Sequence, residues 1–274
     1  MPVTSKPAGY GAGFTLVELL VAIASAGFVL VGLARLLTFT LDGYSLQVQM
    51  AEMHQNVHYA FRQLSEIVMQ AGADLPDTAS GIAVVVVQTA EDFSMMVNPA
   101  GGNQVFESVP GSVQSVPVGN PRHFVRADSV IIVFKDGSAP RSVGIDTGYS
   151  TGGFVRGIDT GAGLVRLVTP VGLSAGDQMC SFNRRRLYRD AASNELRHIV
   201  NTTEYLLVEG IDSMSVTFRD SAGGATTGWN SMKAAAVHVT ARTPRPHRRY
   251  VHPVKGDGYR RASLDMVVRL RNRM

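Results

Sequence analysis

The stretch GFTLVELLVAIA (residues 13–24) is strongly apolar, yet it contains one carboxylate, Glu18. It opens a longer apolar run over residues 14–41, in which the charged residues are Glu18 and Arg35. As a helix this run covers about 40 Å, which is enough to cross a bilayer. A carboxylate inside such a segment costs roughly 2.5–3.5 kcal/mol on insertion scales unless it finds a partner. Glu18 therefore needs a physical explanation.

The segment ahead of the apolar run, residues 1–13, is short and polar and contains one lysine, Lys6. An ordinary secretory signal places its small-residue cleavage site after the apolar region. No convincing A-x-A site follows this run, and the candidate cleavage residue, Gly13, precedes it. The sequence therefore predicts that processing leaves the apolar segment in the mature protein as an anchor.

The order Gly13, Phe14, Thr15, Leu16, Val17, Glu18 resembles the cleavage and methylation signal of type IV prepilins and of type II secretion pseudopilins. In that family a prepilin peptidase cuts after the glycine on the cytoplasmic side and N-methylates the new first residue. The resemblance implies cleavage after Gly13, methylation of Phe14, and Glu18 as the fifth mature residue, where the family has a glutamate.

The resemblance also implies a role in assembly for Glu18. The N-terminal ammonium of a neighbouring subunit would pair with this carboxylate in a low-dielectric environment, where an unpaired charge is penalised. The alternative is a carboxylate near a membrane surface with no assembly role.

The apolar pattern continues as an amphipathic one from Met50, with apolar residues at spacings of three and four. It stops at Gly72, and Pro76 follows as a second stop signal. We therefore predict one helix over residues 14–71, with one stripe packed on a globular head. The stripe consists of Met53, Val57, Phe61, Leu64 and Val68.

Three residues inside the membrane half of this helix affect how it would pack or bend. Gly27 and Gly32 suit either close helix packing or local melting during filament assembly, and the sequence does not separate the two. Major pilins usually carry a proline where this chain has Arg35, which departs from the family pattern of a proline-dependent kink.

These boundaries divide the chain into a leader (1–13), a transmembrane half-helix (14–41), an amphipathic half-helix (42–72) and a β-rich head (73–274). The 28 glycines have no repeat period, so they mark turns between short strands. We predict an α+β fold in which the long helix packs on an antiparallel sheet, as in type IV pilins. The predicted strands are residues 82–89, 129–134, 164–169, 178–182, 205–208, 214–219, 235–241 and 263–270.

Residues 259–272 resemble the closing strand of PilW-type minor pilins. Residues 210–216 and the Val-Thr-Ala-Arg segment that ends at Arg242 extend this resemblance to the C-terminal third. The stretch from about residue 90 to residue 174 carries no family resemblance.

Candidate chemistry is sparse, and we predict no catalytic residue, metal or cofactor. His54 and His58 have an i, i+4 spacing that can hold a metal, but without an HExxH motif we interpret them as a solvated helix face. Residues 159–163 are glycine-rich but lack the lysine of a P-loop, so we interpret them as a turn. Cys180 has no second cysteine to pair with and is interpreted as a small strand residue.

Two runs of arginine, at residues 184–186 and between Arg242 and Arg249, could contact phosphates. Alternating strand arginines and a proline-stiffened loop explain them at least as well, and the formal net charge of +4 is modest. Nucleic-acid binding is therefore not favoured.

The resemblance implies a minor type IV pilin that a prepilin peptidase processes. It would join other major and minor pilins in the filament, near the tip, through the inner-membrane assembly platform. It would first be a single-pass inner-membrane protein with a periplasmic head, and then part of the pilus at the cell surface. The alternatives are a type II secretion minor pseudopilin, a pilus-displayed binding module, and a membrane-tethered enzyme whose prepilin-like start is coincidental.

Overall fold

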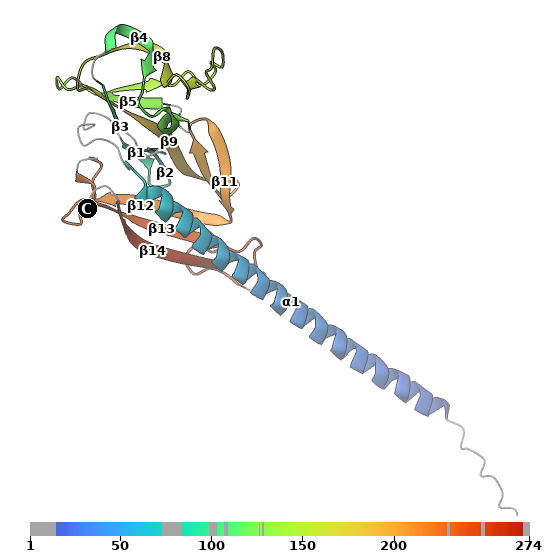
Figure 1. Ribbon diagram of the computed structural model, residues 1–274. Coiled ribbons are helices and arrows are strands. Elements are labelled where there is room, and N and C mark those ends of the chain that lie inside the picture. The colour runs from blue at the N-terminus through green and yellow to red at the C-terminus, as the bar shows by residue number, and fades with distance from the viewer. Residues whose placement is uncertain are drawn as a thin grey trace, which may run out of the picture. The chain divides into compact units, whose positions relative to one another are not determined.

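The computed structural model describes residues 15–72, 84–98, 103–106, 109–125, 127, 129–228, 231–247 and 250–270. It has an α+β fold, in which a long N-terminal helix, α1 (Leu16–Met69), is followed by antiparallel strands (Figure 1). The chain divides into two compact units at the bond between Met50 and Ala51, inside α1.

The first part of α1 is the apolar segment. Residues 15–45 are all exposed, and the helix is long and apolar enough to cross a membrane. It continues through Gly27, Gly32 and Arg35 without interruption. A Cβ placed on either glycine would meet nothing within 4 Å, so neither glycine packs against the described chain.

The part of α1 after Ala51 belongs to the head, and it buries one stripe of side chains. This stripe confirms the predicted one and also includes Ala60, Ser65 and Ile67. The helix ends at Met69 rather than at residue 71, because the amide of Ala71 donates to the carbonyl of Val68 in a tighter turn. Gly72 follows with φ +65°, a conformation that favours glycine.

The strands after α1 range from two residues in β7 to thirteen in β9. Their bounds are β1 Val85–Thr89, β2 Asp92–Val97, β3 Asn103–Val105, β4 Val109–Pro117, β5 Ser129–Val133, β6 Arg141–Gly144, β7 Ile158–Asp159, β8 Leu164–Leu173, β9 Gln178–Asp190, β10 Glu195–Val200, β11 Thr203–Glu209, β12 Ile211–Arg219, β13 Ala234–Arg242 and β14 Arg261–Arg269, with a 3₁₀ turn, η2, at Pro121–Phe124.

The strands form three antiparallel sheets. The largest has the order β1-β2-β9-β10-β11, with β3 and β5 also on β9 and with β6 on β5. The second has the order β12-β13-β14 and the third the order β4-β8-β7. Strand β9 is central, because its first residues pair with β3 and β5 and its later residues pair with β2 and β10.

The residues between β2 and the middle of β9, 98–182, form an insert. Its two ends are neighbours, since Val97 of β2 lies opposite Asn183 of β9. The insert includes most of the stretch that resembles no family, and it contains β3 to β8 together with the first part of β9.

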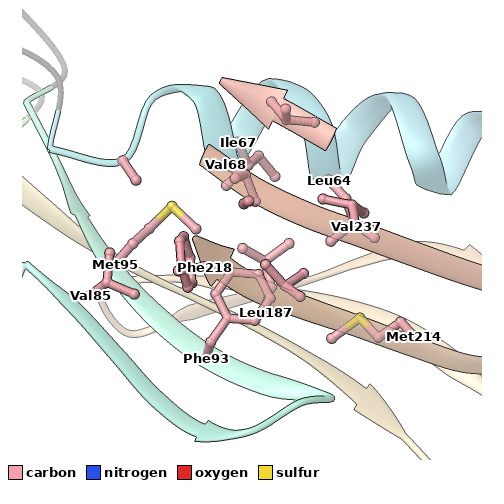
Figure 2. Packing of buried hydrophobic residues seen from close by; sticks show 14 of the residues in the cluster. Leu64, Ile67, Val68, Val85, Phe93, Met95, Leu187, Met214, Phe218 and Val237 are labelled. Carbon is pink, nitrogen blue, oxygen red and sulfur yellow. The ribbon is translucent and has the colours of Figure 1, made fainter. Parts of the chain in front are cut away.

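The buried apolar side chains of the described head form two hydrophobic cores. In the first, Leu64, Ile67 and Val68 of α1 lie over β12, β13, β2 and β9, and the rings of Phe93 and Phe218 meet edge to face at 6.2 Å (Figure 2). The second core lies inside the insert. Its members are Phe106, Val116, Val118, Phe124, Ala127, Val130, Ile132, Val143, Ile145, Ile158, Val165, Leu167, Val171, Leu173 and Met179.

Strand β5 lies between the two cores. Ile131 and Val133 belong to the first core, and Val130 and Ile132 belong to the second. A strand buried on both faces needs apolar residues at consecutive positions rather than alternation. This explains the unbroken run of four aliphatic residues in β5.

Each of the eight predicted strands coincides with a strand of the structure, with differences at the ends; residues 82 and 83 lie outside the described residues. Strands β2, β3, β4, β6, β7 and β10 were not predicted. β4 carries two prolines and Gly111, which are disfavoured in strands. The arginine-rich second half of β9 was also missed. It is held by cross-strand pairs from Arg186 to Asp92 and from Arg189 to Glu91.

We expect a shortened protein that begins at Gln47 to be soluble and monomeric. The first buried residue is Met53, so this truncation removes the apolar segment and no core side chain. Size-exclusion chromatography and circular dichroism should show a monomer with mixed helix and sheet. Aggregation or loss of the sheet signal would show that residues before Gln47 are needed for folding.

Candidate functional site at the start of the long helix

Glu18 lies in the first turn of α1, where it forms a reciprocal pair with Thr15. The Glu18 carboxylate accepts hydrogen bonds from the backbone amide and from the hydroxyl of Thr15, both at 2.9 Å. The amide of Glu18 donates to the Thr15 hydroxyl at 3.3 Å. This is a capping box, which satisfies backbone donors that would otherwise lack a partner at the helix N-terminus.

The capping box gives Glu18 a local role that we did not predict. Its signal was present in the sequence, because Thr15 and Glu18 match the pattern of a Ser or Thr followed three residues later by Glu. Both residues would remain after cleavage at Gly13. Because Thr15 uses one carboxylate oxygen, Glu18 Oε2, the pairing leaves acceptor capacity on the carboxylate.

Gly13 and Phe14 lie outside the described residues, so their roles in cleavage and methylation stay predictions. Among the described residues, the structure brings Glu18 together with Thr15. The part that can be described is a capped, exposed helix start with a carboxylate in its first turn.

The other candidate residues have ordinary surroundings. His54 and His58 are exposed on α1, and within the described part of the chain no three potential metal-ligating side chains come together. Burial raises the pKa of the Cys180 thiol to about 12, against a weaker opposing hydrogen bond to the Ile131 carbonyl. Such a thiol is not ionised near neutral pH, so it is chemically inert.

The glycine-rich residues 159–163 form a turn, as predicted. The Asp159 carboxylate accepts hydrogen bonds from the amides of Gly161 and Ala162 at 2.9 and 2.8 Å. Arg185 and Arg186 lie in β9 beyond the predicted strand end at residue 182, and they point to opposite faces of the sheet, which agrees with the interpretation of this run as alternating strand arginines. Arg185 donates to the Gln70 side chain at 3.0 Å, and Arg186 pairs with Asp92 at 2.7 Å.

A cluster of ionised side chains joins the start of β12 to the start of β14. Arg261 binds the Asp212 carboxylate at 2.8 Å and the Asp257 carboxylate at 2.6 Å. Burial alone would raise the pKa of Asp212. The hydrogen bonds and charge of Arg261, together with the charges of Lys255 and Arg242, outweigh burial and lower that pKa below its usual value. Arg261 also lowers the pKa of Asp257 to about 2.

The outer face of the β12–β14 sheet carries a hydrogen-bonded chain. Asp265 meets the Nδ1 atom of His238 at 2.6 Å, Thr240 meets its Nε2 atom at 3.0 Å, and Ser263 meets Thr240 at 2.8 Å. The order carboxylate, imidazole, hydroxyl is that of a hydrolytic triad. However, Thr240 is buried, and β13 has a partner strand on each side that uses its backbone amides. Those amides cannot form an oxyanion hole, so we assign the chain no catalytic role.

No protein-family model, curated protein or solved structure matches this chain. Its function is therefore inferred from its own residues and fold.

Proposed function

We propose that the protein is a minor type IV pilin, which a prepilin peptidase processes and which enters the filament through its N-terminal helix. The observation that carries this proposal is the prepilin-like order of Gly13, Phe14 and Glu18 at the start of a long apolar helix, with Glu18 in its first turn. The later part of that helix packs an apolar stripe on antiparallel strands, which is the arrangement the resemblance implies. A capped helix start is compatible with an acid that also meets a neighbouring subunit.

The proposal includes partners and a location. The apolar part of α1 would anchor the protein in the inner membrane with its head in the periplasm. The assembly platform would then move it into a filament with other major and minor pilins, near the tip. A buried ion pair between Glu18 and the Phe14 ammonium of a neighbour would fix the register of the helices.

A type II secretion minor pseudopilin is the nearest alternative, because that system uses the same processing signal. A pilus-displayed binding module is a second candidate, and one observation favours it. Most buried side chains of the insert form a hydrophobic core of their own, whereas Ile131, Val133, Cys180 and Phe182 belong to the core that contains α1. The part of the insert outside these four residues can therefore vary with little effect on the packing of the helix.

We expect co-expression with a prepilin peptidase to remove residues 1–13. Intact-mass analysis should then show a chain that begins with N-methylated Phe14. A bulky residue in place of the small one should prevent cleavage, so Gly13→Leu serves as the control. A product that begins after residue 41 would instead show ordinary signal-peptide removal and contradict the pilin proposal.

A further inference from the structure

The loop between β13 and β14, residues 243–260, has a fixed conformation in its described part. Backbone hydrogen bonds cross it from Thr243 to Arg260 at 2.9 Å, from His247 to Gly258 at 2.8 Å and from His252 to Asp257 at 2.6 Å. The ion pairs of Arg261 hold its base. We call this segment the β13–β14 loop. The side chains that it presents are therefore held in place.

Two aliphatic side chains project from this loop into solvent. Val251 is 71% exposed and Val254 is 86% exposed, more than any other large apolar side chain in the described part of the head. Single exposed valines are normal on protein surfaces. These two valines are three residues apart on an ordered loop that also carries Arg245, Lys255 and Arg260.

The surroundings of these valines are basic. The β13–β14 loop and the strand residues that flank it carry five cationic side chains. The carboxylates close to them are Asp212 and Asp257. Both carboxylates bind Arg261, and Asp212 also lies 3.8 Å from Arg242 and from Lys255. Within the described residues Arg245 and Arg260 form no ion pair. The five cations are Arg242, Arg245, Lys255, Arg260 and Arg261.

Two of the arginines are stacked on tyrosine rings. The guanidinium of Arg242 lies 4.3 Å from the ring centre of Tyr259, and that of Arg260 lies 4.9 Å from the ring centre of Tyr250. Stacking orients each guanidinium. One N–H group of Arg242 lies 3.8 Å from the Asp212 carboxylate. Stacking also covers the ring face that a nucleic-acid base would need.

The loop begins at the end of the sheet where the chain enters the head. The Asn56 side chain donates to the Glu209 carbonyl at 3.2 Å, and the Arg242 amide donates to the Gly210 carbonyl at 2.8 Å. Nine residues lie between Leu41, where the apolar run ends, and Ala51, where the head starts, so these two residues are about 15 Å apart along the helix. About three turns of helix therefore separate the head from the apolar run along the chain.

We propose that the β13–β14 loop binds the anionic lipid headgroups of the membrane in which α1 is anchored, with Val251 and Val254 inserted at the interface. The inference rests on the membrane anchoring proposed above, and it does not require a filament. Interfacial binding uses both features of the loop, because aliphatic side chains enter the headgroup boundary while cations meet lipid phosphates. A nucleic-acid backbone would use the cations but would gain little from two projecting valines.

The test uses the protein shortened to begin at Gln47, which keeps every buried residue of the head. It should sediment with vesicles that contain phosphatidylglycerol and not with vesicles of phosphatidylcholine alone. Each cation near an anionic surface contributes about fivefold in affinity, so Arg245→Gln with Lys255→Gln should weaken binding by tenfold or more. Added salt should weaken it as well.

A second pair of substitutions, Val251→Ser with Val254→Ser, should also weaken vesicle binding at least several-fold without changing thermal stability. The matched control is Val155→Ser, since Val155 lies in the insert and is 70% exposed. For charge, the control is Arg141→Gln with Arg184→Gln, which removes two exposed arginines elsewhere. Both controls should bind vesicles like the wild type.

The proposal is overturned if phosphatidylglycerol vesicles do not bind, or if the controls lose as much affinity as the loop variants. A second contrary outcome combines two results: the Arg245→Gln, Lys255→Gln variant loses binding to a DNA duplex, and the Val251→Ser, Val254→Ser variant binds vesicles normally. That outcome would indicate a nucleic-acid surface and overturn the proposal. None of these results depends on cleavage after Gly13. The filament proposal is therefore tested separately by the intact mass of the processed chain.

Discussion

Glu18→Gln should leave the protein processed and membrane-resident but depleted at least tenfold from sheared filaments. Glutamine at this position can still accept the hydrogen bonds of Thr15, so the capping box is kept and the charge alone is removed. The N-terminal ammonium of the neighbouring subunit would then lack its partner. Leaving a buried charge unpaired costs about 3–5 kcal/mol, and even 1.4 kcal/mol is a tenfold change in an equilibrium.

Two further variants separate the assembly role from the capping role. Glu18→Leu removes both the charge and the cap, so it should be depleted at least as strongly as Glu18→Gln. Thr15→Ala removes the cap and keeps the charge, at a cost of about 1 kcal/mol in helix stability, so it should enter filaments nearly as well as the wild type. The measurement is the ratio of filament protein to membrane protein at matched expression. Normal assembly of Glu18→Gln together with failure of Thr15→Ala would show that Glu18 acts only as a cap.

Arg261→Met should destabilise the head by about 3–5 kcal/mol, the usual cost of removing one partner of a buried ion pair. The side chains of Arg261 and Asp212 are 8% and 9% exposed, so solvent screens their interaction little. For a domain of this size the change corresponds to a fall of roughly 10 °C in Tm. Urea unfolding of the protein that begins at Gln47 would measure it. Arg269→Met, on the exposed side of the same strand, is the matched control and should change stability by about 0.5 kcal/mol or less.

The pH dependence supplies an independent check on the same cluster. The pKa values of Asp212 and Asp257 are lowered in the folded protein, to about 2 for Asp257. A carboxyl group with a lowered folded pKa stabilises the fold above its unfolded pKa of about 4, and this contribution is lost as pH falls through the folded value. The stability difference between the wild type and Arg261→Met should therefore be largest near neutral pH and shrink between about pH 4 and pH 2. A difference that does not change over this range would mean that these carboxylates do not supply the stability.

Much of the fold could be predicted because its signals are local. The apolar stripe on α1 follows from a spacing of three and four residues, and β12 and β13 follow from alternation, with Val216 and Val237 facing the core. Strand β10 gave no such signal. Its Glu195 and Arg197 form an ion pair at 2.6 Å on the exposed side of the strand, and pairing with β9 and β11 determines its conformation.

The candidate sites show the same limit. The capping box could have been predicted, because Thr15 and Glu18 are three residues apart. The cluster of Asp212 and Arg261 could not, because 49 residues separate them and only the pairing of β12, β13 and β14 brings them together. The solvent exposure of Val251 and Val254 could not be predicted either, because a sequence does not indicate which side of a long loop faces solvent.

The adjacency of Val97 and Asn183 has an evolutionary consequence. Because the chain leaves and re-enters the sheet at opposing positions of one antiparallel pair, a direct turn between these strands would close an ordinary hairpin. An ancestor with that hairpin could have acquired residues 98–182 in a single step, without threading or reordering the strands that support α1. Any module in this position would have to supply apolar side chains in place of Ile131, Val133, Cys180 and Phe182, which complete the core beneath α1.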